Sequence, residues 1–116
     1  FYVEEEGVPP YDELIVIANK KDIDSGRIRK FVNSIERGVQ YLVNHPSKSW
    51  KLFIKGRKEL NDELNKRAWR DTLPRFALRP GALDRNRYEN FSVFLKKQGL
   101  IKNTPPLSEY AIELGQ

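Results

Sequence analysis

Three consecutive glutamates near the start of the chain are the residues best suited to bind a ligand. Glu4, Glu5 and Glu6 precede a Gly-Val-Pro-Pro sequence at residues 7–10, which is typical of a turn, and Tyr11 follows it. Carboxylates at such a turn can accept paired hydrogen bonds from an amidine, an ammonium group or an aminopyrimidine. A solvated acidic loop explains the same residues equally well. Tyr11 is suited either to stack on a ligand or to anchor the turn.

The rest of the sequence offers little for catalysis. The single histidine, His45, stands before Pro46 at a predicted helix end, a position that favours capping or exposure. The chain has no cysteine, which excludes disulfides, thiol catalysis and cysteine-bound zinc. It also contains no nucleophile elbow, no phosphate-binding glycine loop and no metal-ligand spacing. We therefore expect no catalytic residue, metal or cofactor in this chain.

Composition indicates a soluble, helix-rich chain. Of its 116 residues, 39% are hydrophobic and 32% charged, with a net charge of +5. No apolar run approaches the roughly 20 residues that a membrane-spanning helix needs. The basic residues are scattered among acidic ones and form no nucleic-acid-binding motif, so we expect solvated charged faces and no nucleic-acid partner.

One short apolar run predicts a strand over residues 13–19. Leu14-Ile15-Val16-Ile17-Ala18 is uninterrupted and rich in β-branched residues, which is typical of a strand buried on both faces. No second run of this kind follows, and such a strand needs hydrogen-bonding neighbours on both sides. The chain is therefore expected to be a piece of a larger protein.

Helices are predicted to fill the region after this strand. A long amphipathic helix presents one apolar face and ends near Asn44, because His45 precedes a proline. The residues of that face are Ile28, Phe31, Val32, Ile35, Val39 and Leu42. A short helix capped by Ser47 follows. A third helix runs from Leu60 to a break at Leu73-Pro74.

Two more helices are predicted near the end of the chain. Asp84 caps a fourth helix, and Gly99 has the position of a left-handed residue that ends it, with Leu100 placed to touch Leu95. Ser108 caps a last short helix. The aromatic and apolar residues of the third and fourth helices are expected to form one core, made of Trp69, Leu73, Phe76, Phe91 and Leu95.

The order of motifs along nearly the whole chain resembles a known family, the substrate-binding proteins of ABC transporters for thiamine-pyrimidine precursors. These belong to the thiamine-pyrimidine-synthase-like family. The resemblance rests on Val3–Ile15, on Asp24, Ile28, Phe31, Gly38, Tyr41 and Trp50, on Leu60–Asn65, Ala68-Trp69, Thr72–Phe76 and Pro80, and on Leu83-Asp84, Arg87-Tyr88, Phe91, Phe94, Gly99–Ile101 and Tyr110-Ala111. Glu6 departs from it, since many relatives are expected to carry histidine there.

The resemblance implies an α/β fold of the type II periplasmic-binding-protein class, of which this chain is the C-terminal portion. Residues 1–12 would form the crossover or hinge segment, 13–19 the buried strand, and 22–116 a region of about five helices. In a two-lobed binder the crossover passes the back of the cleft. The implied ligand contacts are therefore Glu5 first, then Glu4, then Tyr11.

The implied function is binding of an aminopyrimidine, of the formylaminopyrimidine or hydroxymethylpyrimidine type, for an ABC importer. The expected partners are a membrane permease and the missing lobe of the same protein, with self-association also expected. The expected location is periplasmic, or extracytoplasmic and membrane-anchored. Two alternatives stay open: a thiamine pyrimidine synthase of the same family, and an independent basic helical domain that binds nucleic acid.

Overall fold

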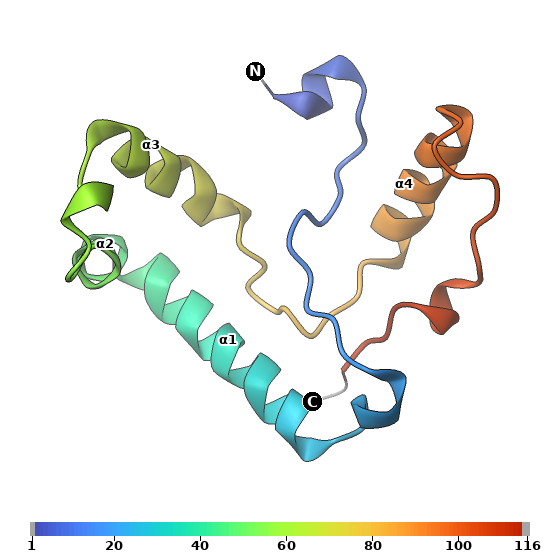
Figure 1. The fold of residues 1–116 in the computed structure, drawn as a ribbon, viewed down its shortest axis with the longest axis horizontal. Helices are drawn as coiled ribbons and strands as arrows, with labels where there is room; N and C mark the ends of the chain where they lie inside the picture. Colours follow the sequence, from blue (N-terminus) through green and yellow to red (C-terminus); the bar gives the residue numbers. More distant parts are fainter. Residues whose placement is uncertain (1, 115–116) are drawn as a thin grey trace. The chain divides into compact units, whose positions relative to one another are not determined.

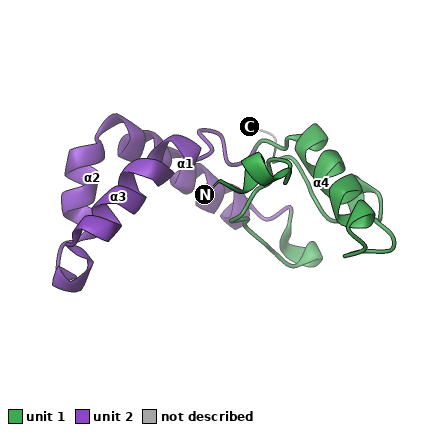
Figure 2. Ribbon diagram, turned by 90° about the horizontal axis from the view of Figure 1, so that it is seen from above, with its two compact units in different colours: residues 1–23, 82–116 green, residues 24–81 purple. Residues whose placement is uncertain are grey.

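The computed structural model describes residues 2–114, and its regular structure there is entirely helical (Figure 1). This part of the chain contains four α-helices and five short 3-10 helices. The chain divides into two compact units, residues 1–23 with 82–116, and residues 24–81 (Figure 2). The first unit thus combines an N-terminal segment with a C-terminal one.

The second unit begins with α1 (Gly26–Asn44) and α2 (Pro46–Phe53). Ser25 caps α1 by accepting a hydrogen bond from the Ile28 N–H, and on the apolar face Val32 is only 5% exposed. Asn44 ends α1 as predicted. The predicted Ser47 cap is wrong, because Pro46 takes the first helical position of α2 and His45 therefore becomes the flanking residue.

The third predicted helix is shorter than expected. A 3-10 turn, η3 (Lys58–Leu60), contains Leu60, and α3 (Glu63–Thr72) begins only after Asp62. The Asp62 carboxylate accepts from the Asn65 N–H at 2.7 Å, which fixes the start of the helix. The break at Leu73-Pro74 is confirmed, since α3 gives way there to η4 (Leu73–Arg75).

Aromatic rings pack between α2 and α3. The Trp69 ring lies 5.5 Å from that of Trp50 and 5.2 Å from that of Phe53, measured between centroids. Trp69 is half-buried. The five residues predicted to form one core are divided between the units, with Trp69, Leu73 and Phe76 in the second and Phe91 and Leu95 in the first.

The first unit is built on α4 (Arg85–Lys97). Asp84 caps this helix by accepting from the Arg87 N–H at 3.1 Å, as predicted. Gly99 has φ 70°, and the N–H groups of Gly99 and Leu100 donate to the carbonyls of Lys96 and Leu95. These two bonds form the predicted Schellman turn.

The last predicted helix is instead a single 3-10 turn, η5 (Leu107–Glu109). It follows Pro106, so the cap assigned to Ser108 is wrong. Proline fixes the backbone immediately before the turn, and Ser108 lies inside it.

The strand predicted over residues 13–19 is also wrong. Residues 15–19 have no regular secondary structure, and Leu14 and Ile17 are 92% and 84% exposed. No strand occurs within residues 2–114, so this run has no hydrogen-bonding neighbour, and an isolated strand is not stable in water. The sheet expected for an α/β fold is therefore not seen in this part of the chain.

Candidate functional site

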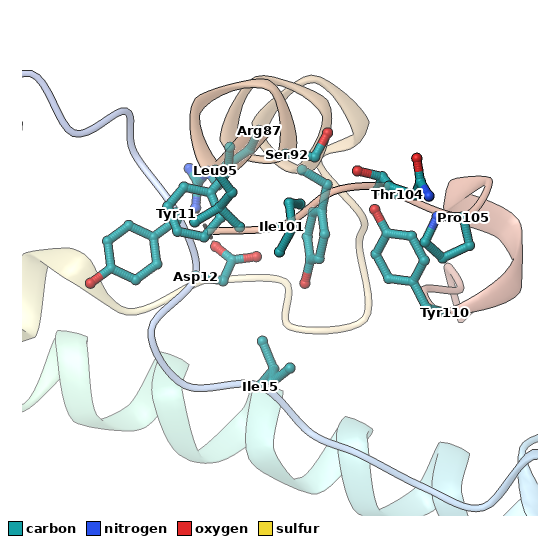
Figure 3. Close-up of a pocket in the computed structure, with 13 residues that line it drawn as sticks. Tyr11, Asp12, Ile15, Arg87, Ser92, Leu95, Ile101, Thr104, Pro105 and Tyr110 are labelled. Atoms are coloured by element: carbon teal, nitrogen blue, oxygen red, sulfur yellow. Dashed lines mark hydrogen bonds and ion pairs between the residues drawn. The ribbon is translucent and has the colours of Figure 1, made fainter. Parts of the chain in front are cut away.

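The first unit contains a pocket of about 440 Å³ (Figure 3). Three segments supply its walls: the N-terminal segment, α4, and the chain that follows α4. The lining residues are Tyr11, Asp12, Ile15, Arg87, Tyr88, Phe91, Ser92, Leu95, Ile101, Asn103, Thr104, Pro105 and Tyr110. Most of this surface is aromatic or aliphatic, as in pockets that bind small organic molecules.

Local sequence explains how α4 presents its wall. Arg87, Phe91 and Leu95 are spaced by four residues, which places them along one face of the helix. Tyr88 and Ser92 lie on the adjoining row. The Schellman turn at Gly99 then reverses the chain, so that residues 101–105 return beside α4 and close the pocket.

Two contacts hold the N-terminal segment against α4. The Tyr11 ring stacks on the Phe91 ring, with centroids 4.6 Å apart and 9° between the planes. The next residue, Asp12, accepts a hydrogen bond from Arg87 Nη1 at 2.5 Å across 75 positions of sequence. Figure 3 shows both N-terminal side chains at one end of the pocket.

The charges at this end shift two ionisation equilibria. The hydrogen bond to Asp12 raises the pKa of Arg87 above its ordinary value, so the guanidinium stays charged. Burial raises the pKa of the Tyr88 phenol, and the negative charge of Asp12 adds to the effect. The pocket therefore contains a fixed ion pair beside a neutral tyrosine.

The opposite end of the pocket offers hydrogen-bonding groups. Thr104 Oγ1 is buried and has no hydrogen-bond partner, although a buried hydroxyl normally has one. The rings of Tyr88 and Tyr110 lie 6.4 Å apart between centroids, and Thr104 and Tyr110 neighbour each other in Figure 3. A ligand that fills the pocket can bond this hydroxyl.

The structure separates the residues that the sequence grouped as a site. Tyr11 lines the pocket, but Glu4 and Glu5 do not. Both glutamates are exposed in the 3-10 helix η1 (Val3–Glu6), which Gly7 ends with φ 87°. The stack of Tyr11 on Phe91 shows that this tyrosine anchors the segment, one of the two roles predicted for it.

Sequence reasoning missed Asp12, Arg87 and Tyr88. Arg87 and Tyr88 lie close to Phe91 on a predicted helix. A partly buried arginine usually pairs with an acidic residue. Nothing in local sequence identifies Asp12 as that partner, because the two residues are 75 positions apart.

The described residues hold no group of histidine, cysteine, aspartate or glutamate side chains that could bind a metal ion. None of the helices within residues 2–114 has the length and hydropathy of a membrane span.

Comparisons with known proteins relate the chain to thiamine metabolism. Residues 1–49 match the model of a family described as NMT1/THI5 like. A protein of Haemophilus influenzae named "Putative thiamine biosynthesis protein" is 41% identical over 115 residues. That match covers 98% of this chain but 37% of the relative, so the chain spans well under half of the relative's length. No solved structure matches the chain.

Proposed function

This chain is a member of the NMT1/THI5-like family, and we propose that the protein to which it belongs binds an aminopyrimidine precursor of thiamine. The observation that carries the proposal is the similarity to the Haemophilus protein over 98% of the chain, together with that protein's name. A role in handling the pyrimidine precursor follows from the family.

The pocket of the first unit has a size and lining that fit part of such a ligand. Its volume of about 440 Å³ lies within the range of small-molecule sites, roughly 300–1,000 Å³. A flat pyrimidine ring is compatible with its aromatic walls, and the unpartnered Thr104 hydroxyl can pair with a polar group of the ligand that reaches the opposite end of the pocket. We place the ring at the Tyr11 end of the pocket, because the chain runs from Tyr11 back to Glu5 and Glu4 within a few residues.

Glu5 first and Glu4 second are the proposed carboxylate contacts, with Tyr11 third. An aminopyrimidine offers an exocyclic N–H donor, and its ring nitrogen becomes a second donor when protonated. A carboxylate accepts from both, and its negative charge favours the protonated ring. Exposure of Glu4 and Glu5 on η1 leaves them accessible to a ligand.

Transport is the more specific function that we propose. The protein would be the substrate-binding component of an ABC importer, located outside the cytoplasm, with a membrane permease as partner. The protein would have two lobes that close on the ligand. Because both lobes would contact the ligand in the closed state, that state would bind it more tightly than the open state. The main alternative is a pyrimidine synthase of the same family. A cysteine cluster upstream of this region would favour synthesis, and a lipoprotein or signal peptide would favour transport.

Calorimetric titration of the full-length protein with hydroxymethylpyrimidine and formylaminopyrimidine tests the proposal. Replacing Glu5 or Glu4 by glutamine should weaken binding by about 1.5–3 kcal/mol, because one charge-assisted hydrogen bond is lost. Glu13→Gln is the matched control, since Glu13 is also exposed and lies just past the pocket-lining Tyr11 and Asp12. Absence of binding by the wild type would refute the function, whereas unchanged binding by both variants would refute only the glutamate contacts.

A further inference from the structure

We propose that Asp12 and Arg87 are positioning residues for ligand binding, an inference that rests on the proposed function. Their ion pair fixes the N-terminal segment on α4 and thereby sets where Tyr11 and the preceding glutamates stand. Neither residue is proposed to contact the ligand.

The contacts between the segment and the helix have a matched spacing. Asp12 pairs with Arg87, and its neighbour Tyr11 stacks on Phe91, one helical turn further along. Each contact therefore fixes the register of the other. If the ion pair is removed, the segment keeps only the stack and can rotate about it.

Arg87 is itself held in place at the start of the helix. Its backbone N–H donates to Asp84 Oδ1 at 3.1 Å, and its Nε lies 3.7 Å from Asp84 Oδ2. The same aspartate thus caps α4 and orients the guanidinium toward Asp12. The arginine is pre-organised before the N-terminal segment docks, which limits the entropy lost when the pair forms.

The segment between the ion pair and the glutamates is stiff. Pro9 and Pro10 separate Tyr11 from η1, and the proline ring fixes φ at both positions. The Val8 N–H also donates to the Val3 carbonyl across the end of η1, at 3.2 Å. A displacement at Asp12 is therefore expected to move Glu4 and Glu5 as well.

Stabilising the fold does not by itself account for this ion pair. The side chains of Arg87 and Asp12 are 41% and 34% exposed, and ion pairs at this exposure contribute little to global stability. The pair connects two distant segments at the wall of a pocket, as a positioning contact must.

Titration of the full-length protein and its variants with hydroxymethylpyrimidine tests the inference. Arg87→Ala should lower the affinity about tenfold to a hundredfold, as misplaced contact groups do. Arg87→Lys keeps the charge but loses the contact of Nε with Asp84, so it should recover part of the affinity that Arg87→Ala loses. Arg85→Ala, an exposed arginine two residues away on the same helix, is the matched control and should have no effect.

Two further readouts separate positioning from loss of the fold. The thermal unfolding midpoint of Arg87→Ala should stay close to that of wild type. The upfield NMR shifts that the Phe91 ring imposes on the Tyr11 ring protons should shrink in Arg87→Ala and return in Arg87→Lys. Asp12→Asn should behave as Arg87→Ala does, and the double variant should lose no more affinity than either single variant.

The outcomes are distinguishable. If wild type binds the pyrimidine and both Arg87→Ala and Asp12→Asn bind within about twofold of it, the positioning role is overturned and the proposed function stands. If affinity and unfolding midpoint fall together and Arg87→Lys fails to rescue, the pair is merely structural. If wild type does not bind, the proposed function fails and this inference fails with it.

Discussion

The aromatic ring of Tyr11 lies parallel to that of Phe91, with 9° between the planes and 4.6 Å between the centroids. This stack joins residues that are 80 positions apart in the sequence to form one wall of the pocket. It explains why a tyrosine predicted as a ligand contact also has a structural role.

Replacing Phe91 by leucine should preserve most of the apolar volume and remove the stack. We expect the free energy of unfolding to fall by about 0.5–1.5 kcal/mol, the contribution of an aromatic pair beyond simple burial. Chemical denaturation of the full-length protein measures this change. Phe31→Leu is the control, because Phe31 is 57% exposed and its substitution should cost less than about 0.5 kcal/mol. Equal effects of the two substitutions would show that the stack contributes nothing.

The raised pKa of Tyr88 predicts a loss of stability at alkaline pH. Burial, the larger cause, favours the neutral phenol in the folded protein, so the unfolded chain loses this proton first as the pH rises past the ordinary value of 10.0. Fewer protons are then bound in the unfolded state than in the folded state, and stability decreases with pH. The contribution is fully present below pH 10 and is lost as the pH rises through the folded-state pKa.

Tyr88→Phe isolates this effect from other titrating groups. Above pH 10 the free energy of unfolding should fall less steeply with pH in the variant than in wild type, with similar slopes near pH 8. Parallel curves over the whole range would contradict the assignment.

Two glycines in different conformations should respond in opposite directions to alanine. Gly99 has φ 70°, a left-handed conformation that costs an L-residue roughly 1–2 kcal/mol, so Gly99→Ala should destabilise by about that amount. Gly38 lies inside α1, and an added Cβ there would meet no atom within 4 Å. Gly38→Ala should therefore stabilise by about 0.5–1 kcal/mol. Thermal unfolding of both variants gives the comparison, and the same sign for both would refute it.

The exposed apolar run predicts self-association of the 116-residue chain when it is prepared alone. Leu14 and Ile17 are 92% and 84% exposed, and a flat apolar segment with unpaired backbone groups can pair with another copy. Sedimentation velocity should show the average mass rising with concentration.

Leu14→Lys combined with Ile17→Lys should reduce that rise, because charged side chains oppose such pairing. Leu52→Lys is the control, since Leu52 is also exposed but lies in α2. A wild-type chain that stays monomeric at every concentration and unfolds in one sharp transition would contradict the prediction.

Much of the helical structure could be predicted because its signals are local. Pro46 after His45, the Asp84 cap and Gly99 each act within one helical turn, and the structure confirms the helix boundaries that they predict. The errors at Ser47 and Ser108 arose where a nearby proline determined the start of the helix instead.

The sequence by itself determined where α1 ends, where α4 begins and ends, and which family the chain resembles. Only the tertiary structure decided that Asp12 pairs with Arg87 and that Leu14–Ala18 forms no strand. Caps and turns depend on neighbours a few residues away, whereas an ion pair across 75 positions and a β-strand both depend on distant partners. For Arg87 that partner is present in this chain. For the apolar run, the described residues supply no second strand.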